Sequence, residues 1–276
     1  MKKILISDFT IKEVPHGGSE WVNQVLIDKF NLEFKYSNRV NGFNKSNLYI
    51  ISNVSLMNPS FVKQIHKLNY IIIENDYKIC QSRHPWIYPD SIIPINERTN
   101  YEMYRNAKAV FVQTTDHLNV YKSNGVEGNF INLHSSIWSE SDLNMLTELL
   151  TLNESKNKKQ AIYSTNNFIK NTNGNIKYCV ENNIEYELIP NMENRRDFLQ
   201  KLSECKGLVF YPIARETFCR LVVEAKCLGL EVTTSKNYGA SKEEWFDELS
   251  GKDMIDFLRK QTENNLTKIS EYINKK

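Results

Sequence analysis

Short apolar runs alternate with amphipathic stretches along most of the chain, a pattern typical of strands and helices that alternate in a parallel sheet. In the first half, the apolar runs predict strands at 3–7, 34–36, 48–52, 70–73, 107–113 and 129–133. Helical spacing of apolar residues predicts helices at 19–30, 59–68, 100–106, 115–123 and 139–150. Because strands and helices take turns, we expect an α/β fold with doubly wound sheets.

The pattern restarts after a polar, charged stretch at 153–160, which we interpret as a linker between domains. Strands are then predicted at 160–164, 185–189, 207–211 and 231–234, and helices at 175–182, 195–204, 215–228, 253–259 and 266–273. This restart predicts three parts: an N-terminal domain at 1–152, a second α/β domain at 160–250, and C-terminal helices at 251–276 that pack back on the first domain.

The segment 207–232 carries the clearest candidate chemistry. Pro212 stops a buried strand, Arg215-Glu216-Thr217 opens the predicted helix, and Gly229 ends it. Glu216 and Glu224 are separated by seven residues, so both carboxylates can face one crevice. A helix N-terminus suits a phosphate, and a carboxylate within the helix can accept hydrogen bonds from sugar hydroxyls.

This segment, with Pro212, Glu216-x7-Glu224, Glu-Ala and Gly229, resembles the donor-site signature of retaining GT-B-fold glycosyltransferases of the group 1, mannosyltransferase-like family. Small viral and bacterial members are the most similar. The resemblance implies two Rossmann-like domains that face a central cleft. It also implies transfer of a sugar from a nucleotide-diphosphate sugar to a hydroxyl, with retention and without a metal or other cofactor. Glu224 would hold the nucleotide ribose, and Glu216 would contact the transferred sugar as a catalytic residue.

The same resemblance assigns further residues to the donor. The Gly17-Gly18 pair directly precedes the first helix, where the family meets the donor phosphate. Lys170 matches a lysine that binds the diphosphate, although Asn171 replaces the glycine that usually follows it, and the arginine usually found a few residues earlier is absent. The remaining donor candidates follow the strand at 207–211: Arg215, Thr217, Phe218 and Arg220.

The end of the strand at 70–73 is the second candidate site, because ligands gather at the carboxyl ends of parallel strands. The segment 74–85 resembles an acidic segment of viral and bacterial glycosyltransferases in which Glu-His-Asp is usual, but Asn75 replaces the histidine. Asp76 is the catalytic candidate here. Weaker acceptor candidates are His16, Glu74, Arg83 and Trp86. A packed, proline-rich loop is the alternative interpretation. No Asp-x-Asp occurs, and we expect no metal site.

Composition restricts the remaining choices. The net charge is +2 and neither half is strongly basic, so the electrostatic pattern of a nucleic-acid binder is missing. Five cysteines without a C-x-x-C pair or a signal peptide indicate reduced thiols in the cytoplasm of a bacterium or an infected host cell. No run of 18 apolar residues exists to span a membrane.

Two alternatives stay open. A glycan is the expected acceptor, but a glycosyltransferase acting on hydroxymethylated bases of viral DNA would have the same fold. A non-catalytic protein that binds nucleotide sugars or serves as a scaffold is the other alternative. The sequence does not identify the donor base, the sugar or the oligomeric state.

Overall fold

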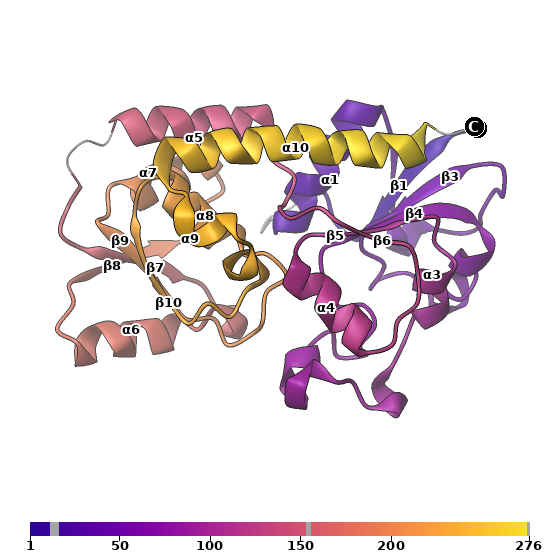
Figure 1. Cartoon of the computed structure of the whole chain (residues 1–276), viewed down its shortest axis with the longest axis horizontal. Helices are drawn as coiled ribbons and strands as arrows, with labels where there is room; N and C mark the ends of the chain where they lie inside the picture. The colour runs from indigo at the N-terminus through magenta and orange to yellow at the C-terminus, as the bar shows by residue number, and fades with distance from the viewer. Residues whose placement is uncertain (12–16, 153–155, 275–276) are drawn as a thin grey trace. The chain divides into compact units, whose positions relative to one another are not determined.

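The computed structural model describes residues 1–11, 17–152 and 156–274. The chain divides into two compact units, Met1–Ile137 with Gln261–Lys276 (unit 1) and Trp138–Lys260 (unit 2). Each unit contains one parallel sheet with helices packed against it (Figure 1). The predicted α/β class is therefore confirmed.

Unit 1 contains a six-stranded parallel sheet in the order β2-β1-β3-β4-β5-β6. Its strands are β1 (Lys3–Ser7), β2 (Glu33–Tyr36), β3 (Leu48–Ile51), β4 (Asn69–Glu74), β5 (Val110–Val112) and β6 (Phe130–Asn132). Strand β2 lies on one side of β1, and β3 to β6 follow one another on the other side of β1. The strand order therefore reverses between β1 and β3, and ligands of such sheets bind outside the carboxyl ends of the strands at this point.

Both faces of the unit 1 sheet are buried, as expected for parallel strands connected by helices. Its helices are α1 (Gly18–Phe30), α2 (Pro59–Val62), α3 (Tyr101–Arg105), α4 (Thr115–Ser123) and the last part of α10 (Gly251–Ile273). Ile71 and Ile73 join the core that includes α1, whereas Ile72 joins the core that includes α3 and α4. The alternation of side chains along β4 thus produces two separate cores.

Unit 2 contains a four-stranded parallel sheet in the order β10-β9-β7-β8. Its strands are β7 (Gln160–Ser164), β8 (Tyr186–Pro190), β9 (Gly207–Phe210) and β10 (Glu231–Thr234). Its helices are α5 (Glu140–Leu152), α6 (Thr172–Glu181), α7 (Arg195–Ser203), α8 (Arg220–Cys227), α9 (Trp245–Glu248) and the first part of α10 (Gly251–Ile273). Helix α6 covers one face of the sheet, and α7 and α8 cover the other (Figure 1). Here the strand order reverses between β7 and β9.

The helix after Pro212 begins later than predicted. We expected Arg215-Glu216-Thr217 to open it, but α8 starts at Arg220. Glu216 instead forms a bridge with Tyr238 in the loop after β10, and Cys219 adopts a left-handed conformation with φ of 75°. Pairing between two loops therefore outweighs the helical preference of this stretch.

The first helix also begins differently. Ser19 was the predicted N-cap, but Gly17 takes this position and α1 starts at Gly18. The Glu20 carboxylate accepts a hydrogen bond from the Gly17 backbone N–H at 2.6 Å, which caps the helix from within its first turn.

Three further boundaries differ from the prediction. The helix expected at 175–182 starts three residues earlier, at Thr172. The helix expected at 59–68 divides into α2 and a 3-10 turn at Ile65–Lys67. The two C-terminal helices form one continuous helix, α10, because no helix-breaking residue separates them. No helix in the described ranges has the length and apolar character that a membrane crossing requires.

Candidate functional site

Lys170 and Glu216 form an ion pair at the point where the strand order of unit 2 reverses. Lys170 follows β7 and Glu216 follows β9, and the Lys170 Nζ lies 2.7 Å from the Glu216 Oε1. The side chains keep 26% and 17% of their exposure, so a ligand can reach them. Burial lowers the pKa of Lys170, but the charge of Glu216, the hydrogen bond to it, and the neighbouring Cys219 and Tyr163 together outweigh burial, so the net shift is upward. Lys170 is therefore a stable cation.

Asn171 explains one departure from the family pattern. Its φ is 56°, in the left-handed region where glycine is favoured and asparagine is the residue best tolerated after it. The Asn171 side chain also donates a hydrogen bond to the Tyr211 carbonyl at 2.8 Å, which connects the loops that follow β7 and β9. The turn that carries Lys170 is therefore kept without glycine.

Glu224 belongs to a buried network of two carboxylates and two guanidinium groups. Arg195, the first residue of α7, donates from Nη2 to the Glu224 Oε1 and from Nε to the Asp142 Oδ1, each at 2.7 Å. Arg220 reaches the Asp142 Oδ2 at 3.3 Å and the Glu224 Oε1 at 3.5 Å. We call these four residues the buried tetrad. Its formal charges cancel.

Burial and the neighbouring charges within the tetrad both shift the pKa values of its members. Burial alone would raise the pKa of Asp142, but Arg195 and Arg220 outweigh it and the pKa falls. Burial and the charge of Arg195 lower the pKa of Arg220, which also stacks on Trp138 at 3.7 Å. The Glu224 carboxylate is therefore held in one place by fixed partners.

The charges of both Glu216 and Glu224 act on Tyr163. It lies in β7, and its ring packs edge-on against Phe198. Burial raises the pKa of Tyr163, Lys170 lowers it, and both Glu216 and Glu224 raise it further. The hydroxyl therefore lies within the electric field of both carboxylates, as expected if they border one space.

Sequence reasoning missed Arg195, Asp142 and Tyr163. Tyr163 had a usable signal, because it stands near the carboxyl end of a predicted strand. Arg195 and Asp142 gave none, since they lie 29 and 82 residues before Glu224 in the sequence (224 − 195 and 224 − 142) and meet it only through the fold.

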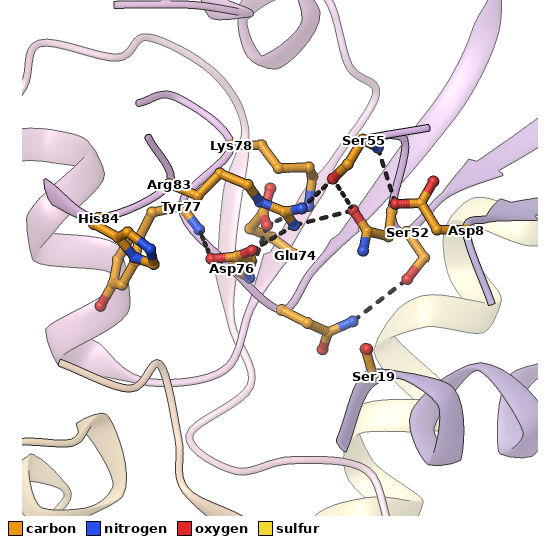
Figure 2. Close-up of polar contacts among 12 residues, drawn as sticks. Asp8, Ser19, Ser52, Ser55, Glu74, Asp76, Tyr77, Lys78, Arg83 and His84 are labelled. Carbon is orange, nitrogen blue, oxygen red and sulfur yellow. Dashed lines mark hydrogen bonds and ion pairs between the residues drawn. The ribbon is translucent and has the colours of Figure 1, made fainter. Parts of the chain in front are cut away.

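The second candidate site lies in unit 1 at the carboxyl ends of β1, β3 and β4. Asp76 and Arg83 form an ion pair there, and the Arg83 guanidinium also contacts the Ser55 hydroxyl and the Asn53 side-chain oxygen, the latter at 3.0 Å (Figure 2). Arg83 has a φ of 61°, which is unfavourable for a non-glycine residue. Both charged side chains are about one-third exposed or less.

Buried groups fix the backbone of Asp76. Its N–H donates to the Glu74 carboxylate at 2.9 Å, and its carbonyl accepts from the Tyr121 hydroxyl at 3.1 Å. The His117 Nδ1 accepts from the Gln113 N–H, so Nε2 carries the hydrogen and donates to the Asp76 carbonyl at 2.9 Å. Burial lowers the pKa of His117 to about 4, which keeps the ring neutral at physiological pH.

Glu74 lies behind this site and does not face its opening. The residue is completely buried, and its carboxylate accepts hydrogen bonds from Lys78 and from the Tyr104 hydroxyl. We therefore assign Glu74 to the support of Asp76, where the sequence had suggested acceptor contact.

Asp8, which follows β1, plays a similar part for the neighbouring loop. Its carboxylate accepts from the Ser37 hydroxyl and from the Leu56 backbone N–H at 3.1 Å. It also accepts from the Ser55 backbone N–H at 3.0 Å (Figure 2). It thereby fixes the loop that presents Ser55 to Arg83.

The other predicted site residues are distributed as follows. Gly17 and Gly18 lie at the start of α1, where Glu20 uses the Gly17 N–H, and His16 lies outside the described residues. Trp86 is half-buried beside His84, with ring centroids 5.3 Å apart. Arg215 is half-buried, and Thr217 and Phe218 are buried. Among residues 1–11, 17–152 and 156–274, no three His, Cys, Asp or Glu residues are placed to hold a metal ion.

Comparison with solved structures identifies the fold. The chain is similar to OtsA, a trehalose-6-phosphate synthase, with a TM-score of 0.61, 8% identity and 99% of each chain covered. It is similar to the E. coli trehalose-6-phosphate structure bound with UDP-2-fluoro glucose, with a TM-score of 0.57, 9% identity and 100% of each chain covered. It is also similar to HepE from Anabaena in complex with UDP and glucose, with a TM-score of 0.51, 12% identity, and 95% of this chain and 89% of HepE covered.

No protein-family model and no curated protein sequence matches the chain. The similar structures are GT-B glycosyltransferases, so the fold predicted from the Glu216-x7-Glu224 segment is confirmed. At this level of sequence identity the similarity concerns the fold, and function has to be argued from the site.

Proposed function

We propose that this protein is a glycosyltransferase that moves a sugar from a nucleotide-diphosphate sugar to a hydroxyl group of a carbohydrate, with retention of configuration and without a metal ion. The observation that carries the proposal is the accessible Lys170–Glu216 pair at the carboxyl ends of β7 and β9, in the same unit as the Glu224 carboxylate that Arg195 holds. Similar structures contain UDP or a UDP sugar, which makes a uridine diphosphate sugar the first donor to test.

The donor roles follow from charge and exposure. Lys170 is a stable cation that can move from Glu216 to a diphosphate, because charge-assisted hydrogen bonds to phosphate are strong. Glu216 is then free to accept hydrogen bonds from the transferred sugar. Glu224, fixed by the two arginines of the buried tetrad, presents a carboxylate to the nucleotide ribose.

The acceptor roles fall to the second candidate site. Asp76, Arg83, Asn53 and Ser55 offer a carboxylate, a guanidinium, an amide and a hydroxyl group within one cluster, and Trp86 supplies a half-buried aromatic side chain on the loop that follows. Such a set matches the hydroxyl groups and apolar faces of a sugar. Because Asp76 balances Arg83, the cluster lacks the excess positive charge that a DNA backbone requires, which favours a glycan over DNA.

The proposed reaction needs little chemistry from the protein. The bond between the anomeric carbon and the phosphate oxygen breaks, and the acceptor oxygen forms its bond on the same face of the sugar. The departing phosphate takes the acceptor proton, so a separate protein base is not required. Lys170 stabilises the negative charge that develops on the leaving diphosphate.

The test compares Lys170→Met with Lys177→Met. Lys177 is an exposed lysine of the same unit, paired with Glu181 at 3.7 Å, and serves as the matched control. Isothermal titration with UDP-glucose, in EDTA and in magnesium, should show affinity that falls by about tenfold or more in Lys170→Met and is unchanged in Lys177→Met. Equal affinities in the two variants would contradict the donor assignment, and binding that requires magnesium would contradict the proposed independence of a metal ion.

Glu224 is a poor first target for this test. Its removal would leave two guanidinium groups with one carboxylate in a buried place, so lost affinity could not be separated from lost stability. Glu216→Gln is the better partner for Lys170→Met, because Glu216 is partly exposed.

Activity separates an enzyme from a binding protein of the same fold. A catalyst should slowly hydrolyse its donor and transfer the sugar to a carbohydrate acceptor, and nuclear magnetic resonance of the first product should show the anomeric configuration of the donor. Donor binding without hydrolysis or transfer to any acceptor would support the scaffold alternative. Transfer to hydroxymethylated DNA would support the other.

A further inference from the structure

A cavity of about 510 Å³ lies in unit 1 and belongs to neither candidate site. It lies beside α2, the 3-10 turn that follows it, and the start of α3. Its lining consists of Val62, Lys63, His66 and residues 98–103. This volume falls within the range of small-molecule sites in proteins.

Positive groups predominate around the cavity. Lys63 and Arg98 are exposed and cationic, and His66 adds an imidazole that can donate a hydrogen bond. The only carboxylate among the lining residues is that of Glu102, which is 68% exposed and pairs with Arg105 at 3.9 Å. Within the part of the chain that the structure describes, Lys63 and His66 make no side-chain hydrogen bond or ion pair. Their polar atoms are therefore available to a ligand.

The inner lining has a different character. Met103 is 3% exposed and belongs to the core, and Val62 packs against the same core. The Tyr101 hydroxyl donates to the Asn124 carbonyl at 3.1 Å, which fixes the ring, and the Arg98 guanidinium lies 5.7 Å from the centre of that ring. A thioether, an aliphatic group and an oriented aromatic ring favour an apolar or aromatic body.

We propose that this cavity is a second ligand site, specific for a small organic anion with an apolar or aromatic body and one phosphate or carboxylate group. The body contacts Val62, Tyr101 and Met103, and the anionic group binds Lys63, His66 and Arg98. A neutral ligand would leave Lys63 and His66 without a partner, and an inorganic anion would leave the apolar lining in water. The site therefore requires both parts in one molecule.

The wall of this cavity is connected to the second candidate site. The Asn100 side chain donates to the Lys78 carbonyl at 2.8 Å, and the Thr99 N–H donates to the Ile79 carbonyl at 2.9 Å. A ligand in the cavity thus contacts Thr99 and Asn100, which are hydrogen-bonded to Ile79 and Lys78. Lys78 pairs with Glu74, the residue that supports Asp76.

The test uses 1-naphthyl phosphate, with 1-naphthol and inorganic phosphate as probes that each lack one part. Isothermal titration should show saturable binding of one molecule of 1-naphthyl phosphate, and binding at least about tenfold weaker for each partial probe. Equal binding of 1-naphthol, or no saturable binding of 1-naphthyl phosphate at millimolar concentration, would overturn the proposal.

Three variants locate the bound probe. Lys63→Glu reverses an exposed charge at the cavity and should weaken binding by at least about tenfold, whereas Lys122→Glu makes the same change on the exposed surface of α4 and should leave the affinity unaltered. Lys170→Met should also leave it unaltered, because Lys170 belongs to unit 2. Binding lost in Lys170→Met but kept in Lys63→Glu would place the probe at the donor site and refute the proposal.

Discussion

Replacement of Asp142 by asparagine should destabilise unit 2 strongly, although the two side chains have nearly the same shape. Asp142 is 3% exposed and accepts from Arg195 at 2.7 Å and from Arg220 at 3.3 Å. The variant leaves two guanidinium groups with only Glu224 as counter-charge. Loss of one partner from a buried ion pair costs about 3–5 kcal/mol. For a chain of this size, that corresponds to a fall in melting temperature of roughly 6–20 °C.

The assay is urea unfolding followed by circular dichroism, with thermal unfolding as a second measure. Glu148→Gln is the matched control, because Glu148 lies on the same helix and pairs with Arg196 at 2.5 Å, but at the exposed surface. Exposed pairs contribute little, since water screens them. Asp142→Asn with no greater effect than Glu148→Gln would refute the argument from the buried tetrad.

A double variant tests the reasoning further. Asp142→Asn combined with Arg195→Gln leaves one cation, Arg220, and one anion, Glu224, so the formal charges balance again. The double variant should lose less stability than the sum of the two single variants, because each single change leaves an unbalanced charge that the other removes. Strict additivity would mean that the charges are not coupled.

The pH dependence of stability should follow the same network. The pKa of Asp142 is lower in the folded chain than its ordinary value, because the two arginines outweigh the effect of burial. Its contribution is therefore complete above the unfolded pKa and is lost as the pH falls through the lowered folded pKa. Asp142→Asn should lack this part of the acid response.

Three other outcomes can be measured by the same unfolding experiments. Tyr104→Phe removes one donor from the fully buried Glu74 and should cost about 1–3 kcal/mol; an unchanged unfolding midpoint would argue against the hydrogen bond. Gly229→Ala should cost about 1 kcal/mol because φ is 67°, whereas Gly42→Ala has open space and no positive φ and should cost nothing, so equal losses would contradict the strain argument. Because burial lowers the pKa of His117 to about 4, the unfolded chain takes up a proton first and stability should fall between about pH 6.5 and 4; His117→Gln should reduce this slope, and an identical slope would exclude His117 as its cause.

The sequence was most informative where a signal was local. Strands were predicted at the positions of all ten from β1 to β10, and the apolar signal was clearest for β3, β4 and β9, which are buried along almost their whole length. The spacing of Glu216 and Glu224, with Pro212 before them and Gly229 after them, led to the correct fold. These features depend on residues that are close together in the chain, so they can be recognised without knowledge of the tertiary structure.

The sequence was least informative where distant segments meet. Arg195 binds the carboxylates of Glu224 and Asp142, which are 29 and 53 residues away from it, and no local pattern predicts this contact. The start of α8 was wrong for a related reason, because Glu216 pairs with the loop after β10. Residues 98–103 include the start of the helix expected at 100–106, and only the fold brings them beside Val62, Lys63 and His66 as the lining of a cavity.

Unit 1 consists of two separate segments of the chain, one N-terminal and one C-terminal, and this affects folding during synthesis. Ile269 and Ile273 are fully buried in the core that also contains Leu5 and Phe111, yet the ribosome adds them only after all of unit 2. At ordinary rates of translation, this delay is on the order of ten seconds. During that time the growing chain exposes an apolar face of unit 1 while the residues of unit 2 are being added. We therefore expect unit 2 to finish folding first, against the direction of synthesis, and expect nascent unit 1 to be the part that chaperones bind.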